Sequence, residues 1–285
     1  FKKKEGVMKI NWKTFFLFST FDIVISGFLL AIFSALTFIL KVHLPSRFNV
    51  AFEIPFYLFL GIILGTFKGA VVAFIFDIMN ALIKGQIHLW AYEYGIIPPL
   101  IAIIASGFLF LLNSKRDIWL LLPTVLTFIV ASVVLIYYLK MPDSEIQRTS
   151  KSWKGIFNKQ LIIGLLAVIY SFAFFVGGTL LFLYHKTHNR KWRLAFVVFV
   201  ILVFIFVVFR YFWHPIAFVR YYNRFLNRTG KDRYISQYFF FYLTPIILKS
   251  TITLPVYTFC LVTLTPLVLD LNKKHNFKSR LGWMK

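Results

Sequence analysis

Asp77 is the ionisable side chain whose position most needs a chemical explanation. It lies in the apolar stretch FEIPFYLFLGIILGTFKGAVVAFIFDIMNAL, residues 52–82. In a bilayer a charged side chain near the centre costs roughly 2.5–3.5 kcal/mol on insertion scales, so it usually faces a partner or a water-filled cavity. Asn80 follows about one helical turn later and would share that cavity. The pair therefore predicts a polar site inside a helical bundle.

Two predicted loops, after the first and third apolar runs, carry side chains that can converge on one opening. The candidate binding residues are Arg47 and Asn49 in the first loop and His88, Trp90, Tyr92 and Tyr94 in the second. Aromatic rings with a few polar groups suit a pocket for a flat heterocycle. The same aromatics also suit an interfacial belt at the membrane surface, and both interpretations are open.

The sequence lacks the established motifs of several enzyme classes. It contains no GxxxxGK[ST] phosphate loop, no HExxH pair and no GxSxG elbow. Its six histidines are scattered, so we expect neither a metal site nor a cofactor. Asp77, His88 and Glu93 leave open a membrane-embedded lipid-handling enzyme that uses them for acid–base chemistry. A structural membrane subunit without a ligand is a further alternative.

Three arginines form a regular series near the C-terminal end of the chain. Arg220, Arg224 and Arg228 are spaced by four residues and share one face if the segment is helical. Such a face suits lipid phosphate or a partner protein. Binding of the anionic tail of a ligand is the alternative.

Composition assigns the chain to the membrane. Of its 285 residues 59% are hydrophobic and 15% charged, which is more apolar surface than a soluble domain of this size buries. The apolar runs are continuous rather than alternating, so we predict an all-α, polytopic membrane helix bundle. We attribute the 32 Lys and Arg against 10 Asp and Glu to loops lying on anionic lipid, and expect no nucleic-acid partner. The one cysteine, Cys260, predicts no disulfide.

We predict about eight spans in a single integral membrane domain, residues 1–285. The spans are expected at 15–40, 51–66, 69–83, 95–113, 118–139, 161–184, 194–213 and 251–270. A tight turn is expected at 66–68 and a polar stretch at 214–237, while prolines should split 238–270 into a short helix and one span. The first four spans place eight basic residues on the N-terminal side and three on the other. The positive-inside rule then predicts a multi-pass protein with both termini in the cytoplasm.

Small residues recur at intervals of four in the early spans. One column is Gly27, Ala31 and Ala35, and a second is Gly61, Gly65, Gly69 and Ala73, which leads to Asp77. This spacing stacks residues on one helix face and lets a neighbouring backbone approach closely. We expect the second column to bring the second and third helices together. The first column either packs within the chain or contacts a separate membrane partner.

The order of these features resembles the membrane substrate-binding (S) component of an energy-coupling-factor (ECF) vitamin transporter. Ala31 and Ala35 in AIFSA match the family's AxxxA motif, and IPFYLFLGIILGTFKGAVVAFIFDIMNALI is similar to its pattern of glycine, short turn, glycine and aspartate. WAYEYGIIPPLIAIIASGF looks like the entry to the fourth helix and ITLPVYTFCLVTLTPLVLDL like the closing helix. The match covers residues 17–113 well and 240–270 loosely. The family has six helices, whereas we count eight spans.

The resemblance implies a six-helix core with inserted membrane helices. Residues 15–113 would form the first four helices, 114–193 the inserted helices and loops, and 194–285 the closing helices and basic tail. It also implies vitamin uptake at the cell membrane, with docking through the first-helix column onto a transmembrane coupling (T) subunit and two ATPase subunits. The loop aromatics suit a pterin or flavin and the arginines a carboxylate, so folate stands slightly ahead of riboflavin. Asp77 would accept a hydrogen bond from a ring N–H of the ligand.

Overall fold

The computed structural model of this chain is a bundle of helices. It describes residues 16–43, 53–83, 85–113, 118–140, 159–227, 230 and 232–281. The helices are α2 (Thr20–His43), α3 (Glu53–Leu64), α4 (Thr66–Ile83), η2 (Ile87–Leu89), α5 (Tyr92–Gly95), α6 (Ile97–Asn113), α7 (Ile118–Lys140), α9 (Lys159–Thr187), α10 (Arg190–Ile205), η4 (Phe206–Trp213), α11 (His214–Tyr221), η5 (Tyr222–Leu226) and α12 (Ile235–Leu281). These ranges contain no strand, and the predicted all-α membrane bundle is confirmed.

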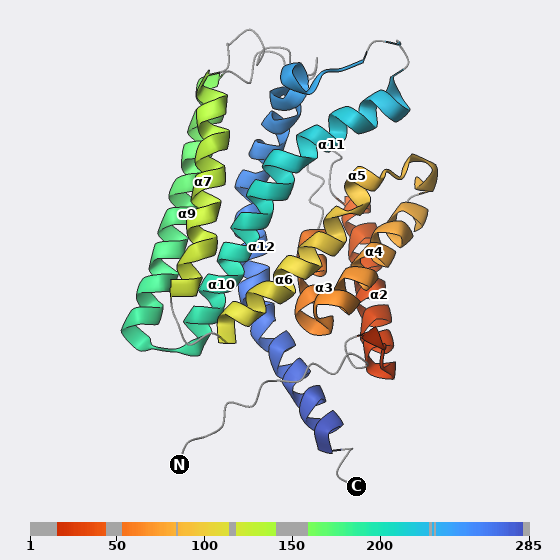
Figure 1. Cartoon of the computed structure of the whole chain (residues 1–285), viewed down its shortest axis with the longest axis vertical. Coiled ribbons are helices and arrows are strands. Elements are labelled where there is room, and N and C mark those ends of the chain that lie inside the picture. The colour runs from red at the N-terminus through yellow and green to blue at the C-terminus, as the bar shows by residue number, and fades with distance from the viewer. Residues whose placement is uncertain are drawn as a thin grey trace.

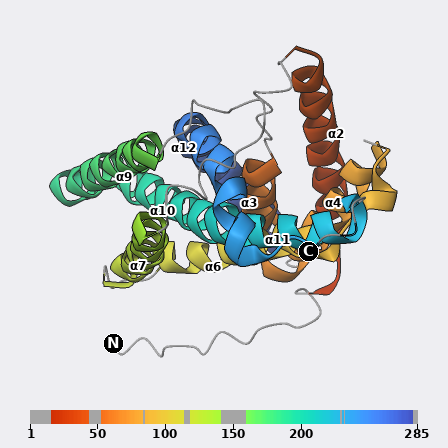
Figure 2. The same ribbon diagram turned by 90° about the horizontal axis from the view of Figure 1, so that it is seen from above.

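Helix α10 occupies the middle of the bundle. Figure 1 and Figure 2 show α7 and α9 on one side of the molecule and α2 on the other, with α10 and α12 between them. Every residue from Leu194 to Leu202 is buried, and α10 packs against α6, α7, α9 and α12. A helix that is apolar on all sides suits such a central position or a membrane span.

The eight predicted spans each coincide with a helix, but the helices differ in length. Four segments of the described chain are long and apolar enough to cross a membrane: Thr66–Ile83, Ile163–Thr187, Arg190–Leu226 and Phe241–Leu267. Helix α3 has only 12 residues, or about 18 Å at 1.5 Å per residue, against a hydrocarbon core of about 30 Å. The second predicted span is therefore too short to cross the bilayer alone.

The turn between α3 and α4 is a single residue, Gly65, rather than the predicted turn at 66–68. Gly65 has φ +82°, a backbone conformation that favours glycine, and α4 begins at the next residue. This break divides the predicted column between two helices. Gly61 lies against the backbone of Ala102 on α6, while Gly69 lies against the backbone of α3. The glycines thus bring three helices together.

The predicted polar stretch at 214–237 is mostly helical. Helix α10 continues through η4, α11 and η5 to Leu226, and the turns of η4 and η5 are π-helical. Pro215 has no N–H to donate to the carbonyl of Tyr211, and its ring crowds the preceding turn, so wider turns next to it relieve the clash. Ala217 and Val219 are buried where α11 packs against α12. Burial therefore maintains a helix where proline and arginine predicted its end.

Helix α12 is continuous, whereas two helices were predicted. It contains Pro245, Pro255 and Pro266, yet packs against α3, α9, α10 and α11. Neighbouring helices make prolines tolerable in membrane helices. Hydroxyl side chains also return to its own backbone: Ser250 and Thr258 each donate to the carbonyl four residues earlier.

A single methyl group at Gly61 should destabilise the bundle. Its Cβ would overlap the carbonyl oxygen of Ala102, a backbone atom that no rotamer change can move. We expect Gly61→Ala to cost about 1–3 kcal/mol, measured by thermal unfolding in detergent. Gly107→Ala on α6 is the matched control, because a Cβ there meets nothing within 4 Å. Equal unfolding midpoints for the two variants would contradict the proposed close approach.

Candidate functional site

Two cations line a small cavity between η4 and α12. Arg210 and Lys249 face a space of about 70 Å³, together with the hydroxyl groups of Ser250, Thr253 and Tyr257. Among the residues that the structure describes, neither cation forms a hydrogen bond or an ion pair. Arg210 is half-buried and Lys249 is exposed, and charged side chains within membrane helices normally have a partner or face a water-filled cavity. The cavity therefore suits an anionic group such as a carboxylate.

Further polar groups surround Arg210. Tyr57 on α3 and His214 at the start of α11 each lie within electrostatic range of both Arg210 and Glu53. The Tyr57 hydroxyl and His214 Nδ1 are buried and have no hydrogen-bond partner in the described part of the chain. A buried polar atom without a partner costs about 1–3 kcal/mol, so a bound ligand or water would stabilise this region. We call Glu53, Tyr57, Arg210, His214 and Lys249 the polar cluster.

The two polar residues predicted on α4 both have partners within the chain. The Asp77 carboxylate accepts a hydrogen bond of 2.8 Å from the indole N–H of Trp90. Asn80 is buried and donates 3.1 Å to the Glu53 carboxylate, which connects α4 to the polar cluster. Tyr57 lies within electrostatic range of Asp77 as well. Asp77 thus holds the loop after α4, and its contact with a ligand stays a prediction.

Glu93 forms an ion pair that joins α5 to η5. Its side chain is 1% exposed, and Arg224 donates from Nη2 at 2.9 Å and from Nη1 at 3.4 Å to its two oxygens. The guanidinium also lies 4.8 Å from the ring centroid of Tyr92. The Trp213 indole donates 2.7 Å to the Glu93 carbonyl. Arg224 therefore pairs within the chain, although its side chain is 42% exposed, and contact of the arginine series with lipid, a partner or a ligand stays a prediction. Arg220 is exposed, and Arg228 lies outside the described residues.

The four predicted residues of the second loop point to different places. His88 and Tyr92 are exposed, whereas Trp90 turns inward to Asp77. Tyr94 packs edge-on against His214, with ring centroids 5.3 Å apart, and so reaches the polar cluster. The short helices η2 and α5 direct successive side chains to different sides, which explains the difference. Arg47 and Asn49 lie outside the described residues.

The small-residue column on α2 faces outward. Gly27, Ala31 and Ala35 are exposed, and a Cβ at Gly27 would meet nothing within 4 Å. Helix α2 joins the bundle through a different face, where Phe33 is 1% exposed and packs against Phe56 with ring centroids 5.0 Å apart. Packing within the chain is therefore the wrong interpretation of this column, and its surface is accessible to lipid or a partner helix.

Sequence reasoning missed the two cations of the polar cluster, although a signal was present. Arg210 interrupts FIFVVFRYFW and Lys249 interrupts PIILKSTITL, and the argument applied to Asp77 holds equally for both. Glu53 gave a similar signal at the start of the predicted span 51–66, whereas Tyr57 carries none, because only the packing of α3 brings it near Arg210.

Along most of its length the chain is similar to a mycoplasmal protein. It is 27% identical over 266 residues to the uncharacterized protein MG313 of Mycoplasma genitalium, which covers 87% of this chain and 91% of that protein. No family model matches the chain. No solved structure matches it either. These comparisons therefore assign no function, and the polar cluster and the motifs of residues 17–113 are the features that point to one.

Removing Arg224 should leave the buried Glu93 carboxylate without a partner. Since the arginine side chain is 42% exposed and Glu93 only 1%, the loss in stability should exceed that of a pair exposed on both sides. We expect Arg224→Gln to lower the unfolding temperature and Glu93→Gln to restore part of it in the double variant. Arg220→Gln, one turn earlier and exposed, is the control. A loss as large in Arg220→Gln would refute this role of the pair.

Proposed function

We propose that this protein is the substrate-binding S component of an ECF-type vitamin transporter in the cell membrane. Both termini would lie in the cytoplasm, and the chain would work with a T subunit and two ATPase subunits. The motifs of residues 17–113 support this function, together with the absence of a phosphate loop from the sequence. The inserted helices α7 and α9 would be additions to the family's six-helix core.

The cations Arg210 and Lys249, which form no ion pair with any described residue, are the observation that carries the proposal. A carboxylated ligand would place its acid group in their cavity of about 70 Å³. A whole vitamin needs more room, since pockets for drug-sized ligands measure about 300–1,000 Å³. Its ring would therefore extend toward Tyr57 and His214, whose buried polar atoms lack partners in the described chain. A carboxylate requirement favours folate over riboflavin.

The exposed column Gly27, Ala31 and Ala35 supports docking onto the T subunit. Without a hydrophobic drive between helices in lipid, close backbone contact is what associates them, and small residues permit it. The column lies outside the packed face of α2, so a partner helix would meet it without displacing any helix of this chain.

Loss of either cation should weaken binding of a carboxylated vitamin. Hydrogen bonds to charged groups contribute about 1.5–3 kcal/mol, so Arg210→Gln and Lys249→Gln should each lower folate affinity about tenfold or more. Tryptophan fluorescence of the purified protein measures folate and riboflavin binding in parallel. Arg220→Gln should bind as the wild type does. If folate binds equally to all four proteins, the cavity is not the ligand site; if only riboflavin binds, folate is the wrong ligand.

A bulky residue in the α2 column should separate binding from transport. We expect the wild type to co-purify with a T subunit and ATPase subunits, and Ala31→Trp to lose both this assembly and vitamin uptake. Ligand affinity should be retained, because Ala31 is exposed and distant in sequence from the polar cluster. Ala31→Ser, which stays small, is the control. Loss of binding in Ala31→Trp, or normal assembly, would contradict the docking surface.

A further inference from the structure

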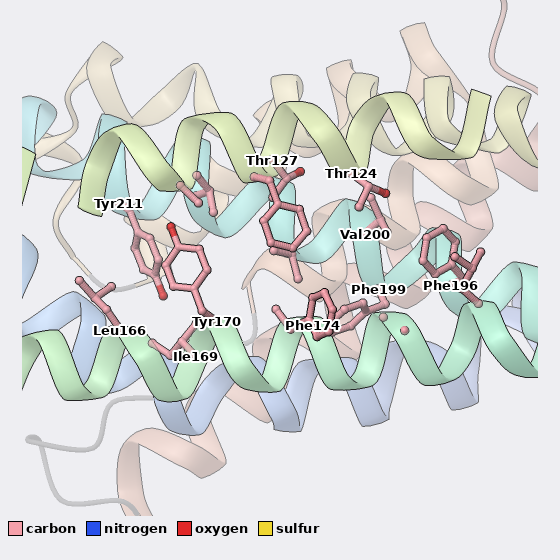
Figure 3. A pocket seen from close by; sticks show the side chains of 18 residues that line it. Thr124, Thr127, Leu166, Ile169, Tyr170, Phe174, Phe196, Phe199, Val200 and Tyr211 are labelled. Atoms are coloured by element: carbon pink, nitrogen blue, oxygen red, sulfur yellow. The ribbon is translucent and has the colours of Figure 1, made fainter. Parts of the chain in front are cut away.

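A second and larger cavity lies between α7, α9 and α10. It measures about 210 Å³ and is lined almost entirely by apolar side chains (Figure 3). None of the polar cluster residues lines it. Phe128 and Phe174 border it and are 40% and 72% exposed, so the cavity reaches the surface that faces lipid. An apolar cavity of this kind suits a hydrocarbon chain and not a vitamin.

The cavity is elongated along α10. Its lining runs from Phe196 to Tyr211, which are 15 positions apart and so about 22 Å along a helix at 1.5 Å per residue. The hydrocarbon core of a bilayer is about 30 Å thick, so one leaflet is about 15 Å deep. The cavity is therefore long enough to hold a single acyl chain.

One end of the cavity lies next to a cluster of basic residues. Leu181 and Phe196 line that end. One turn further out, three residues away on each helix, the Arg193 guanidinium lies 5.8 Å from the ring centroid of Tyr184. The link between α9 and α10 adds the exposed cations Lys186, Arg190 and Lys191. Helices α7, α9, α10 and α11 contain no Asp or Glu, so the charged side chains on these helices are all basic.

We propose that this region binds an anionic glycerophospholipid, with one acyl chain in the cavity and the phosphate at the basic link. Burial of apolar surface stabilises the bound acyl chain, and the cations favour headgroups with a net negative charge. A zwitterionic lipid with the same chains would gain the burial but less of the charge attraction. This site is independent of the proposed vitamin binding, since it shares no residue with the polar cluster.

Binding of the acyl chain is tested by filling the cavity with larger side chains. Gly177 lines it, and a Cβ there would point at the Phe199 ring at 3.5 Å, so Gly177→Leu occupies the space. Ala173→Leu is a second variant that fills the same cavity. Gly164→Leu on the same helix is the matched control, because its Cβ meets nothing within 4 Å and it does not line the cavity. The readout is native mass spectrometry of the full chain with dioleoyl phosphatidylglycerol or dioleoyl phosphatidylcholine.

The wild type and Gly164→Leu should retain phosphatidylglycerol about tenfold better than phosphatidylcholine. The cavity-filling variants should lose retention of both lipids, and Arg193→Gln with Lys186→Gln should lose only the preference. Equal retention of the two lipids by the wild type would overturn the headgroup assignment. Unchanged retention in both cavity-filling variants, or a dimer of this chain that forms instead of the lipid complex, would overturn the site.

Discussion

A charge within the hydrocarbon layer must be enclosed by protein, water or a ligand, and this constraint governs how the helices meet. Asp77 and Glu93 are each satisfied by a side chain from another element further along the chain, Trp90 and Arg224. These contacts fix the loop between α4 and α6 against the rest of the bundle. Arg210 is different, because it forms no ion pair with any described residue and lines a cavity. The contrast separates charges that stabilise the fold from charges available to bind.

Close backbone contact makes the enclosure possible. Helix α3 is short, and Gly61 and Gly69 let α6 and α4 approach it on two sides. This contact buries the helix almost completely, so that Glu53 and Tyr57 face other protein groups and not lipid. Small residues thus position polar ones, although they carry no chemistry themselves.

The central helix serves two environments. Its first part, α10, provides apolar walls for the cavity beside α7 and α9, while Arg210 in η4 belongs to the polar cluster. The wider turns of η4 shift the direction of successive side chains relative to an α-helix, and such turns frequently occur at functional sites. One continuous helix therefore contributes to a hydrophobic site and a charged site through different residues of the same segment.

The amino-acid sequence by itself determined that the chain is a helical membrane protein and where its apolar helices lie, because hydrocarbon tolerates only internally bonded backbone and long apolar runs report this directly. It also marked Asp77 and Asn80 as polar residues that need neighbours. Tertiary packing alone decided which neighbours they have: Trp90 for one and Glu53 for the other. Arg210 and Lys249 are far apart in the chain and share a cavity only because η4 packs beside α12. Local patterns specify which groups must be satisfied in lipid, whereas the packing of distant helices specifies what satisfies them.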